Sequence, residues 1–334
     1  MNRRDLLAAL GSLSGGLSGG LSGGLALGLP GSALAQAGGN VSRIIVPFAA
    51  GGAREAPARA IQQELGAETG QTWIIEAKPG AGGAIGTVAV AKAEPDGRTL
   101  LMAASSHFVT AAMGATPNYD PVKDFQVVAN LGDQNYILLV SGELPVRTVA
   151  EFIALAKSKP GAMNYGSAGI GSSTHLAMAY FVKAAGIDVV HIPYKGTAEA
   201  VTDVGGNRAQ AVIVPTAGSA AFRNDPRYRV LGITGKKRSP TLPNVPTIAE
   251  SGLPGFEFES WFGLIGPAGI PRATVDKLNA AINKLAATKA VQERLIGLGL
   301  DPSPLSVDAF QREFLKDRDL MYRVVNDVGL AKKG

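Results

Sequence analysis

Beyond residue 36, short apolar and β-branched runs alternate with segments of helical periodicity along most of the chain. Runs without polar alternation are typical of strands buried on both faces, in sheets covered by helices. The pattern therefore predicts an α/β fold. The expected strands are residues 43–46, 73–76, 99–102, 136–140, 189–192, 211–214, 230–233 and 262–265.

Local signals mark several helix starts. Residues 148–151 and 247–250 both have the sequence Thr-x-x-Glu, in which the hydroxyl and the carboxylate cap free backbone N–H groups. Apolar residues spaced three and four apart predict an amphipathic helix after Pro271 and another that contains Phe310. The last 60 or so residues are therefore expected to be mostly helical.

The first 35 residues have the three parts of a secretory signal peptide. Arg3 and Arg4 form a charged start, a Leu/Gly/Ala/Ser stretch follows, and residues 33–35 (Ala-Leu-Ala) precede Gln36. The paired arginines also suit twin-arginine export. We expect cleavage near Gln36 and a periplasmic protein; the alternative is a disordered tail or a membrane anchor, although the many glycines make a poor membrane span.

Removal of residues 1–35 leaves about 300 residues, more than one hydrophobic core usually serves. Two lobes are therefore expected. The polar, proline-containing segments 141–147 and 251–256 are the predicted crossover points. This places residues 39–140 and 254–334 in lobe 1 and residues 141–253 in lobe 2. A chain that crosses twice leaves a cleft between the lobes, where ligands commonly bind.

Composition and motifs exclude several classes of function. The net charge is +5, but the basic residues are dispersed and the densest run covers only 236–238, so no nucleic-acid binding is expected. The chain lacks cysteine, and its three histidines have no His-Glu-x-x-His spacing; we expect no metal and no cofactor. No Gly-x-Ser-x-Gly sequence frames Ser105, Ser106, Ser172 or Ser173, the serines that lie near histidines in the sequence. A secreted esterase or amidase that uses Ser172 or Ser173 with a histidine is the remaining enzyme alternative.

Three glycine-rich turns follow predicted strands and precede predicted helices, at residues 47–52, 79–83 and 167–174. Backbone N–H groups at such helix starts can face an anion. None of the turns has the Gly-x-Gly-x-x-Gly or the P-loop spacing, so no nucleotide is expected. The alternative for each turn is a purely structural connection.

At these turns the sequence resembles the solute receptors of tripartite tricarboxylate transporters, also called the Bug family. The matching segments occur in the family's order from about residue 43 to 330. They are 45–48 before Gly51-Gly52, 78–83, 85–86, 95–97, 119–121, 124–125, 164–169, 175–176, 193–196, 237–240, 243–247 and 261–263.

The resemblance implies a two-lobed periplasmic binding protein of the Venus-flytrap type II, with two crossovers. It implies capture of a small carboxylate between the lobes, without catalysis, and delivery to membrane permease subunits; we expect a monomer. It also implies that loops of both lobes hold the carboxylate through backbone and hydroxyl groups. Mapped onto this chain, the candidate ligand-binding residues are Phe48, Ala50, Gly51, Arg54, Ser105, Ser106, His107, Ala168, Gly169, Ser172, Ser173, Thr174, Val214 and Thr216.

Two departures from the family pattern bear on the ligand. Arg54 stands where many relatives have a small polar residue, and Val214-Pro215 replaces a frequent Asp-Asn. The loss of an acid that could receive an ammonium group predicts a dicarboxylate or an aromatic acid rather than an amino acid. The alternative for Arg54 is a solvent-facing residue paired with Glu55 or Glu64. A further open alternative is a sensor that delivers its ligand to a membrane kinase.

Overall fold

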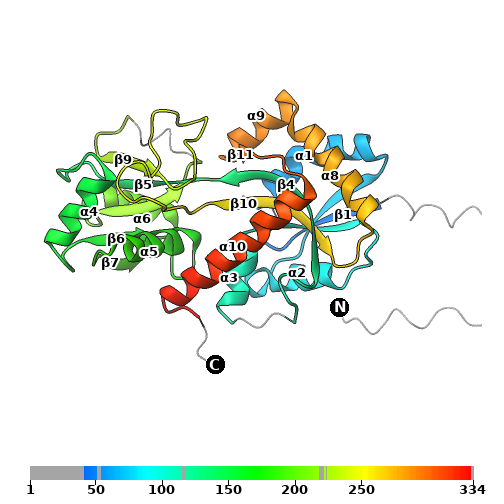
Figure 1. Cartoon of the computed structure of the whole chain (residues 1–334), viewed down its shortest axis with the longest axis horizontal. Helices are drawn as coiled ribbons and strands as arrows, with labels where there is room; N and C mark the ends of the chain where they lie inside the picture. Colours follow the sequence, from blue (N-terminus) through cyan, green and yellow to red (C-terminus); the bar gives the residue numbers. More distant parts are fainter. Residues whose placement is uncertain (1–40, 51–53, 115–117, 218–221, 223, 332–334) are drawn as a thin grey trace, which may run out of the picture. The chain divides into compact units, whose positions relative to one another are not determined.

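The computed structural model describes residues 41–50, 54–114, 118–217, 222 and 224–331. These residues belong to one compact unit, Asn40–Gly334, which has a mixed α/β fold with two sheets (Figure 1). The predicted signal peptide, residues 1–35, lies outside the described residues. Among the described residues, no helix combines the length and the apolar character that a membrane span requires.

The first sheet contains six strands in the order β11-β4-β10-β3-β1-β2. Parallel pairing joins β1 to β2 and β3, whereas β10 is antiparallel to both β3 and β4. The strands are β1 (Val41–Val46), β2 (Thr72–Ala77), β3 (Thr99–Ala104), β4 (Phe125–Gln134), β10 (Ser260–Pro267) and β11 (Asp301–Pro302).

The second sheet contains five strands in the order β7-β6-β8-β5-β9. Here β6 is parallel to β7 and β8, and β5 is antiparallel to β8 and β9. All residues of β5 are buried, as expected for a central strand covered on both faces. The strands are β5 (Tyr136–Ser141), β6 (Asn164–Ser167), β7 (Val190–Pro193), β8 (Ala211–Pro215) and β9 (Tyr228–Ile233).

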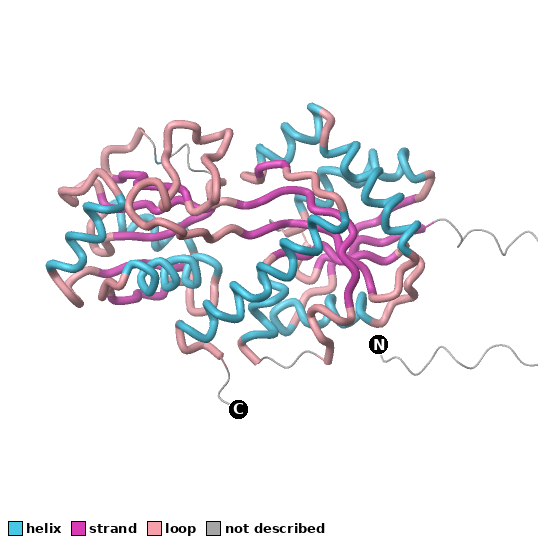
Figure 2. The backbone as a smooth tube through the Cα atoms, viewed as in Figure 1, coloured by secondary structure: helices cyan, strands magenta, loops and turns pink. Residues whose placement is uncertain are grey.

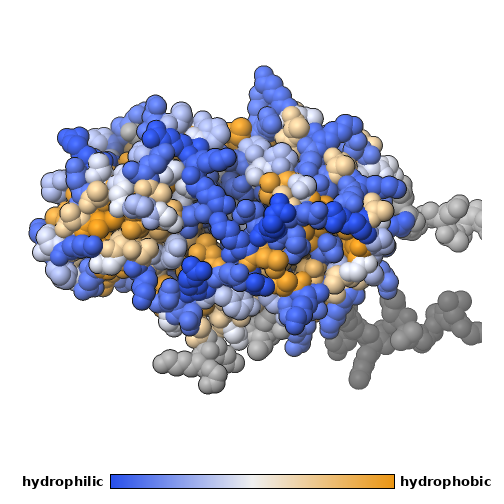
Figure 3. Space-filling view, in the orientation of Figure 1, coloured by the Kyte–Doolittle hydropathy of each residue, from blue (hydrophilic) through white to orange (hydrophobic). Residues whose placement is uncertain are grey.

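Helices connect the strands and cover the sheets. The C-terminal helix α10 contacts β4 of the first sheet and the helix α3, and it also contacts α5, which packs against the second sheet. It therefore contributes to the packing of both sheets. The helices are α1 (Ala56–Thr69), η1 (Ala81–Gly83), α2 (Ala84–Ala91), α3 (Ser106–Ala112), α4 (Val149–Ser158), α5 (Ser173–Ala185), α6 (Thr197–Gly205), α8 (Arg272–Ala286), α9 (Lys289–Gly297) and α10 (Val307–Asp327). On the face drawn in Figure 3, hydrophilic residues predominate and apolar residues form small groups.

The chain passes between the two sheets twice, and Figure 2 shows both passages. In the first, β4 continues through Asn135 directly into β5; in the second, residues 234–259 lead from β9 to β10. The first passage was expected at 141–147, but residues 136–141 already pair with β8 and β9. The lobe limits 39–140, 141–253 and 254–334 stay a prediction, and the pairing of β5 places residues 136–140 with the second sheet.

Each of the eight predicted strands overlaps an observed one, so the α/β prediction is confirmed. The prediction of a helix at 247–250 is wrong. Thr247 and Glu250 do form the reciprocal capping bonds, Thr247 N to Glu250 Oε2 at 2.9 Å and Glu250 N to Thr247 Oγ1 at 3.0 Å. Only a turn follows, because Gly252 has a φ of 138° and Pro254 comes directly after Leu253. The equivalent Thr148 caps α4 as predicted.

Candidate functional site

All three glycine-rich turns connect a strand to a helix, as the sequence predicts. The first lies between β1 and α1, the second between β2 and α2, and the third between β6 and α5. The predicted ligand residue Gly51 lies outside the described residues, and its neighbour Ala50 is exposed. The site is therefore described from Phe48 and Arg54, which lie on either side of residues 51–53.

The Arg54 guanidinium is held between two aromatic rings. Its Cζ atom lies 5.2 Å from the ring centroid of Phe48 and 5.5 Å from that of Phe262 in β10. Its Nη1 donates a hydrogen bond to Ser106 Oγ at 3.0 Å. Burial lowers the pKa of Arg54, although a guanidinium stays charged at any physiological pH.

No acidic side chain of the described residues pairs with Arg54. Glu55 forms its ion pair with Arg59, and Glu64 forms one with Arg294. The alternative of a solvent-facing arginine paired with Glu55 or Glu64 is therefore wrong. A partly buried cation without a counter-charge is an attractive partner for an anion, because desolvation strengthens the charge-assisted bond.

Tyr136 lies near both Arg54 and the third turn. It is the first residue of β5 and is buried, and its hydroxyl donates to Gln134 Oε1 at 3.4 Å. Burial raises the pKa of Tyr136, whereas hydrogen bonds with Ser173 and Ser260 and the charge of Arg54 oppose that rise. These interactions put the Tyr136 hydroxyl near Arg54, near Ser260 at the start of β10, and near Ser173 at the start of α5.

The other hydroxyls of the third turn are engaged within the turn itself. Ser172 caps α5: its Oγ accepts from His175 N at 3.2 Å and donates to Gly169 O at 2.7 Å. Thr174 Oγ1 accepts from Ala168 N at 2.8 Å and is buried. Gly169 has a φ of 110°, which favours glycine at this bend. Of the three predicted hydroxyls, Ser173 is the one oriented toward Tyr136.

Ser105 and His107 face the protein interior, on either side of Ser106. Ser105 is buried beside Asp317 of α10 and lowers the pKa of that carboxyl through a hydrogen bond. His107 donates from Nε2 to Pro121 O at 2.8 Å, and burial lowers the pKa of His107 to about 4. His107 also lines a narrow pocket next to Arg54. Its Nε2 atom is not free for a ligand, because it is bonded to the loop that contains Pro121.

An apolar cavity of about 290 Å³ adjoins Phe262, the ring that packs against Arg54. Elements of both sheets line it, including Val214 and Pro215 at the end of β8. Thr216 follows, and its hydroxyl donates to Gly299 O at 3.3 Å. The other lining residues are Pro57, Gln134, Thr197, Ala217, Phe222, Leu298 and Leu300. None of these lining side chains carries a charge.

The structure thus brings Phe48, Arg54 and Ser106 together with Ser173 and, across Phe262, with Val214. Sequence reasoning missed Tyr136 and Phe262, although both lay in predicted strands. A single tyrosine or phenylalanine in an apolar strand does not indicate a binding site. The residues that surround Tyr136 and Phe262 come from other parts of the chain, so the local sequence does not identify them.

The esterase alternative requires an accessible serine beside a histidine. Ser172 Oγ donates to Gly169 O instead. Ser167 Oγ does lie 2.7 Å from His191 Nε2, but Ser167 is fully buried and no substrate can reach it. The His191 ring stacks on His175 with centroids 4.1 Å apart. Burial, followed by the charge of His191, lowers the pKa of His175 to about 4. The two histidines stabilise the third turn, because His175 Nδ1 accepts from Gly171 N and His191 Nε2 bonds Ser167 Oγ.

Comparison with known proteins gives consistent matches. A family model described as the tripartite tricarboxylate transporter family receptor matches residues 57–330. Protein BugT of Bordetella pertussis is 32% identical over 294 residues, covering 87% of this chain and 90% of BugT. The solved structure of R. palustris Rpa4515 with adipate is similar at 31% identity and a TM-score of 0.70, covering 87% and 97% of the two chains. MatC from Rhodopseudomonas palustris with bound malate is similar at 30% identity and a TM-score of 0.66, covering 85% and 98%.

Proposed function

We propose, because the chain belongs to the tripartite tricarboxylate transporter receptor family, that it captures a small carboxylate and delivers it to the permease of such a transporter. Receptors of this family are periplasmic solute-binding proteins, not enzymes. The ligand would lie between the two sheets, in contact with Arg54, Ser106 and Ser173. The neighbours whose structures contain adipate and malate support the carboxylate class.

The observation that carries the proposal is the unpaired guanidinium of Arg54. It donates to Ser106 Oγ and lies between two rings, and no described acid neutralises it. Its remaining N–H donors have the fork geometry that a carboxylate accepts in a bidentate manner. Ligand binding would therefore supply the counter-charge that the described residues do not provide to Arg54.

The cavity beside Phe262 would hold the part of the ligand that lies beyond the carboxylate at Arg54. The sequence predicts a dicarboxylate or an aromatic acid in preference to an amino acid. The cavity beside Phe262 is lined by uncharged and mostly apolar side chains, so it would desolvate a second carboxylate or an ammonium group without pairing it. This favours the aromatic acid, with its carboxylate at Arg54 and its ring in the cavity.

Export and partners complete the proposal. Arg3 and Arg4 favour the twin-arginine route, and residues 33–35 favour a mature chain that begins near Gln36. We propose a monomer that docks on the membrane permease subunits after it has bound its ligand. No cofactor takes part.

A thermal-shift screen of mono-, di- and tricarboxylates tests the function. A ligand present at 100 times its Kd adds about 2.7 kcal/mol to the free energy of unfolding, so the Tm should rise by several degrees with an aromatic monocarboxylate. Aspartate and glutamate should leave the Tm unchanged. If no carboxylate shifts the Tm, the proposed function is wrong; tight binding of an amino acid would refute the specificity alone.

Two serines of the third turn should respond differently to substitution. Ser173→Val deletes the hydroxyl that faces Tyr136, and one lost charge-assisted bond should weaken carboxylate binding about tenfold. Ser172→Ala removes the cap of α5, so it should lower the free energy of unfolding by about 1 kcal/mol. Calorimetry and urea unfolding of both variants measure the two effects. Unchanged affinity in Ser173→Val would show that this hydroxyl takes no part in binding.

A further inference from the structure

A second and larger cavity, of about 380 Å³, lies beside the two passages between the sheets. Its walls include Asn135, the residue between β4 and β5, and Glu259, the residue before β10. Trp261 and residues of α10 form another wall. The cavity shares no lining residue with the carboxylate site around Arg54.

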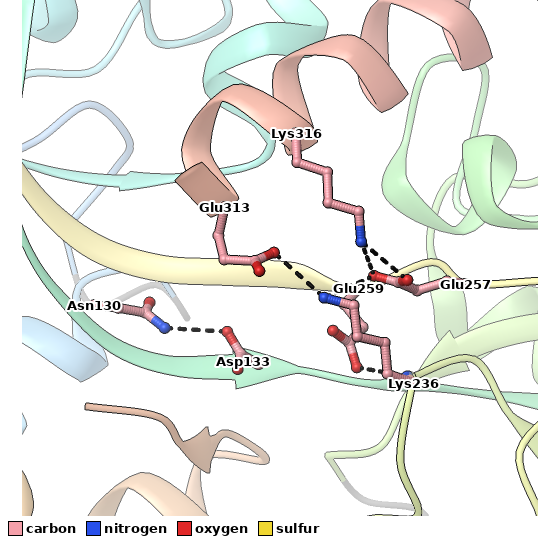
Figure 4. A network of polar contacts seen from close by, with 7 residues as sticks. All are labelled: Asn130, Asp133, Lys236, Glu257, Glu259, Glu313 and Lys316. Atoms are coloured by element: carbon pink, nitrogen blue, oxygen red, sulfur yellow. Dashed lines mark hydrogen bonds and ion pairs between the residues drawn. The ribbon is translucent and has the colours of Figure 1, made fainter. Parts of the chain in front are cut away.

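Charged side chains surround this cavity, and most of the acids have a partner. Lys236 Nζ lies 3.4 Å from Glu257 Oε1 and 3.3 Å from Glu313 Oε2, and Lys316 Nζ lies 3.0 Å from Glu257 Oε1 (Figure 4). The Asp317 carboxylate accepts from Trp261 Nε1 at 2.7 Å. These contacts pair Lys236 and Lys316, and Arg238 pairs with Glu250; Lys237 also lines the cavity.

Asp133 and Glu259 have no cation of their own. Asp133 Oδ1 accepts from Asn130 Nδ2 at 3.1 Å, and Glu259 Oε1 accepts from the backbone N–H of Lys236 at 3.1 Å. Neither forms an ion pair within the part of the chain that the structure describes. Burial raises the pKa of Asp133; burial, followed by the charge of Asp133, raises the pKa of Glu259 to about 7. The cavity wall therefore holds two neighbouring carboxyl groups that form no ion pair among the described residues.

Two buried amide oxygens add to these carboxyls. Asn130 and Asn135 line the cavity and are 1% and 5% exposed, and the Oδ1 atom of each has no hydrogen-bond partner. Their Nδ2 atoms donate to acceptors, Asn130 to Ser303 O at 3.1 Å as well as to Asp133, and Asn135 to Asp301 Oδ2 at 2.8 Å. The amide orientations are thus fixed, and both free atoms are acceptors.

The acceptors converge at Gly235. A Cβ atom at this position would lie 2.0 Å from Asn135 Oδ1 and 2.4 Å from Glu259 Oε1, so both oxygens pack against residue 235, where only glycine fits. Buried acceptors without donors are unfavourable, and here an amide oxygen and a carboxyl oxygen share the same side of the cavity.

We propose that this cavity is a second binding site, for a small organic ammonium ion. An ammonium group supplies several N–H donors and a positive charge, which match the free oxygens of Asn130 and Asn135 and the carboxyls of Asp133 and Glu259. Trp261 and Phe310 in the wall can contact the alkyl part of such a ligand. Among the described side chains no group of three metal-binding residues forms, and the volume suits a small organic molecule. Two carboxyl groups favour a diamine.

Calorimetry of the mature protein with 1,4-diaminobutane tests the proposal. We expect saturable binding by the wild type, at least tenfold weaker binding by Glu259→Gln and by Asn135→Ala, and unchanged binding by the control Glu293→Gln on the exposed side of α9. Circular dichroism confirms that each variant is folded. Carboxylate binding by Glu259→Gln should equal that of the wild type, so a failure here is distinct from a failure at Arg54.

Three results would overturn the proposal. The first is the absence of diamine binding by the wild type, which leaves water as the occupant. The second is equal diamine affinity in the wild type, Glu259→Gln and Asn135→Ala. The third is binding of Ca²⁺ instead of the diamine, lost in Glu259→Gln, which would assign the oxygens to a metal ion.

Discussion

Arg54→Met should weaken carboxylate binding by about 100-fold or more, while the ligand-free protein stays as stable as the wild type or becomes more stable. Methionine keeps most of the volume between the rings of Phe48 and Phe262 but has no charge. Each charge-assisted bond to a carboxylate contributes about 1.5–3 kcal/mol, and a bidentate contact loses two of them. An unpaired, partly buried cation contributes little to folding, because desolvation opposes its burial.

Titration calorimetry gives the affinity, and urea unfolding without ligand gives the stability. Arg98→Met is a matched control, because Arg98 is half-exposed, lies 3.9 Å from Asp96 and directly precedes β3, whereas Ser106 follows the other end of that strand. It should change neither quantity by more than the small contribution of an exposed pair. Equal affinities of wild type and Arg54→Met would remove Arg54 from the site. A large loss of stability would make it a structural residue.

The strands of the fold could be predicted where burial covers both faces. Runs such as 136–140 and 211–214 are apolar throughout, and each lies within an observed strand. Three strands escaped prediction: β4, β6 and the two-residue β11. β4 carries Asn130 and Asp133 in its second half, because it lines the polar cavity there. β6 contains only the four residues Asn164–Ser167, and two of them are a glycine and a serine, which do not indicate a strand.

The candidate site was predictable to the level of its turns, not of its side chains. The three glycine-rich turns were identified from local sequence, and Arg54 was identified as a departure from the pattern of the family that the sequence resembles. The direction of each hydroxyl depends on partners elsewhere: Ser172 bonds Gly169 within its own turn, whereas Ser173 faces Tyr136 of a strand that pairs with β8. Such pairing is a tertiary property, and no spacing in the sequence records it.

Asp317→Asn should stabilise the protein at high pH and leave its stability unchanged at low pH. Asp317 is 8% exposed, forms no ion pair among the described residues, and has Trp261 Nε1 as a hydrogen-bond donor at 2.7 Å. Burial raises the pKa of Asp317 to about 7 from an ordinary value of 3.8. The asparagine amide can keep the Trp261 bond through Oδ1, and its Nδ2 can donate to the neighbouring Ser105 Oγ.

The direction of the effect follows from proton binding. Between pH 3.8 and about 7 the folded wild type keeps a proton on Asp317 that the unfolded chain releases. The favourable contribution is therefore complete below pH 3.8 and is lost as the pH rises through about 7. Asparagine never ionises, so the variant's advantage should grow from nothing near pH 4 to a plateau above pH 7, with an upper limit of about 4 kcal/mol.

Urea unfolding of both proteins between pH 4.5 and 8.5 measures this difference. Glu259, His107 and His175 have shifted pKa values of their own, but they are present in both proteins and cancel in the comparison. Asp276→Asn on α8 is the control, because that carboxylate is half-exposed and paired with Arg272; its effect should be small at every pH. A difference between Asp317→Asn and wild type that is constant with pH would mean that Asp317 titrates normally despite its burial.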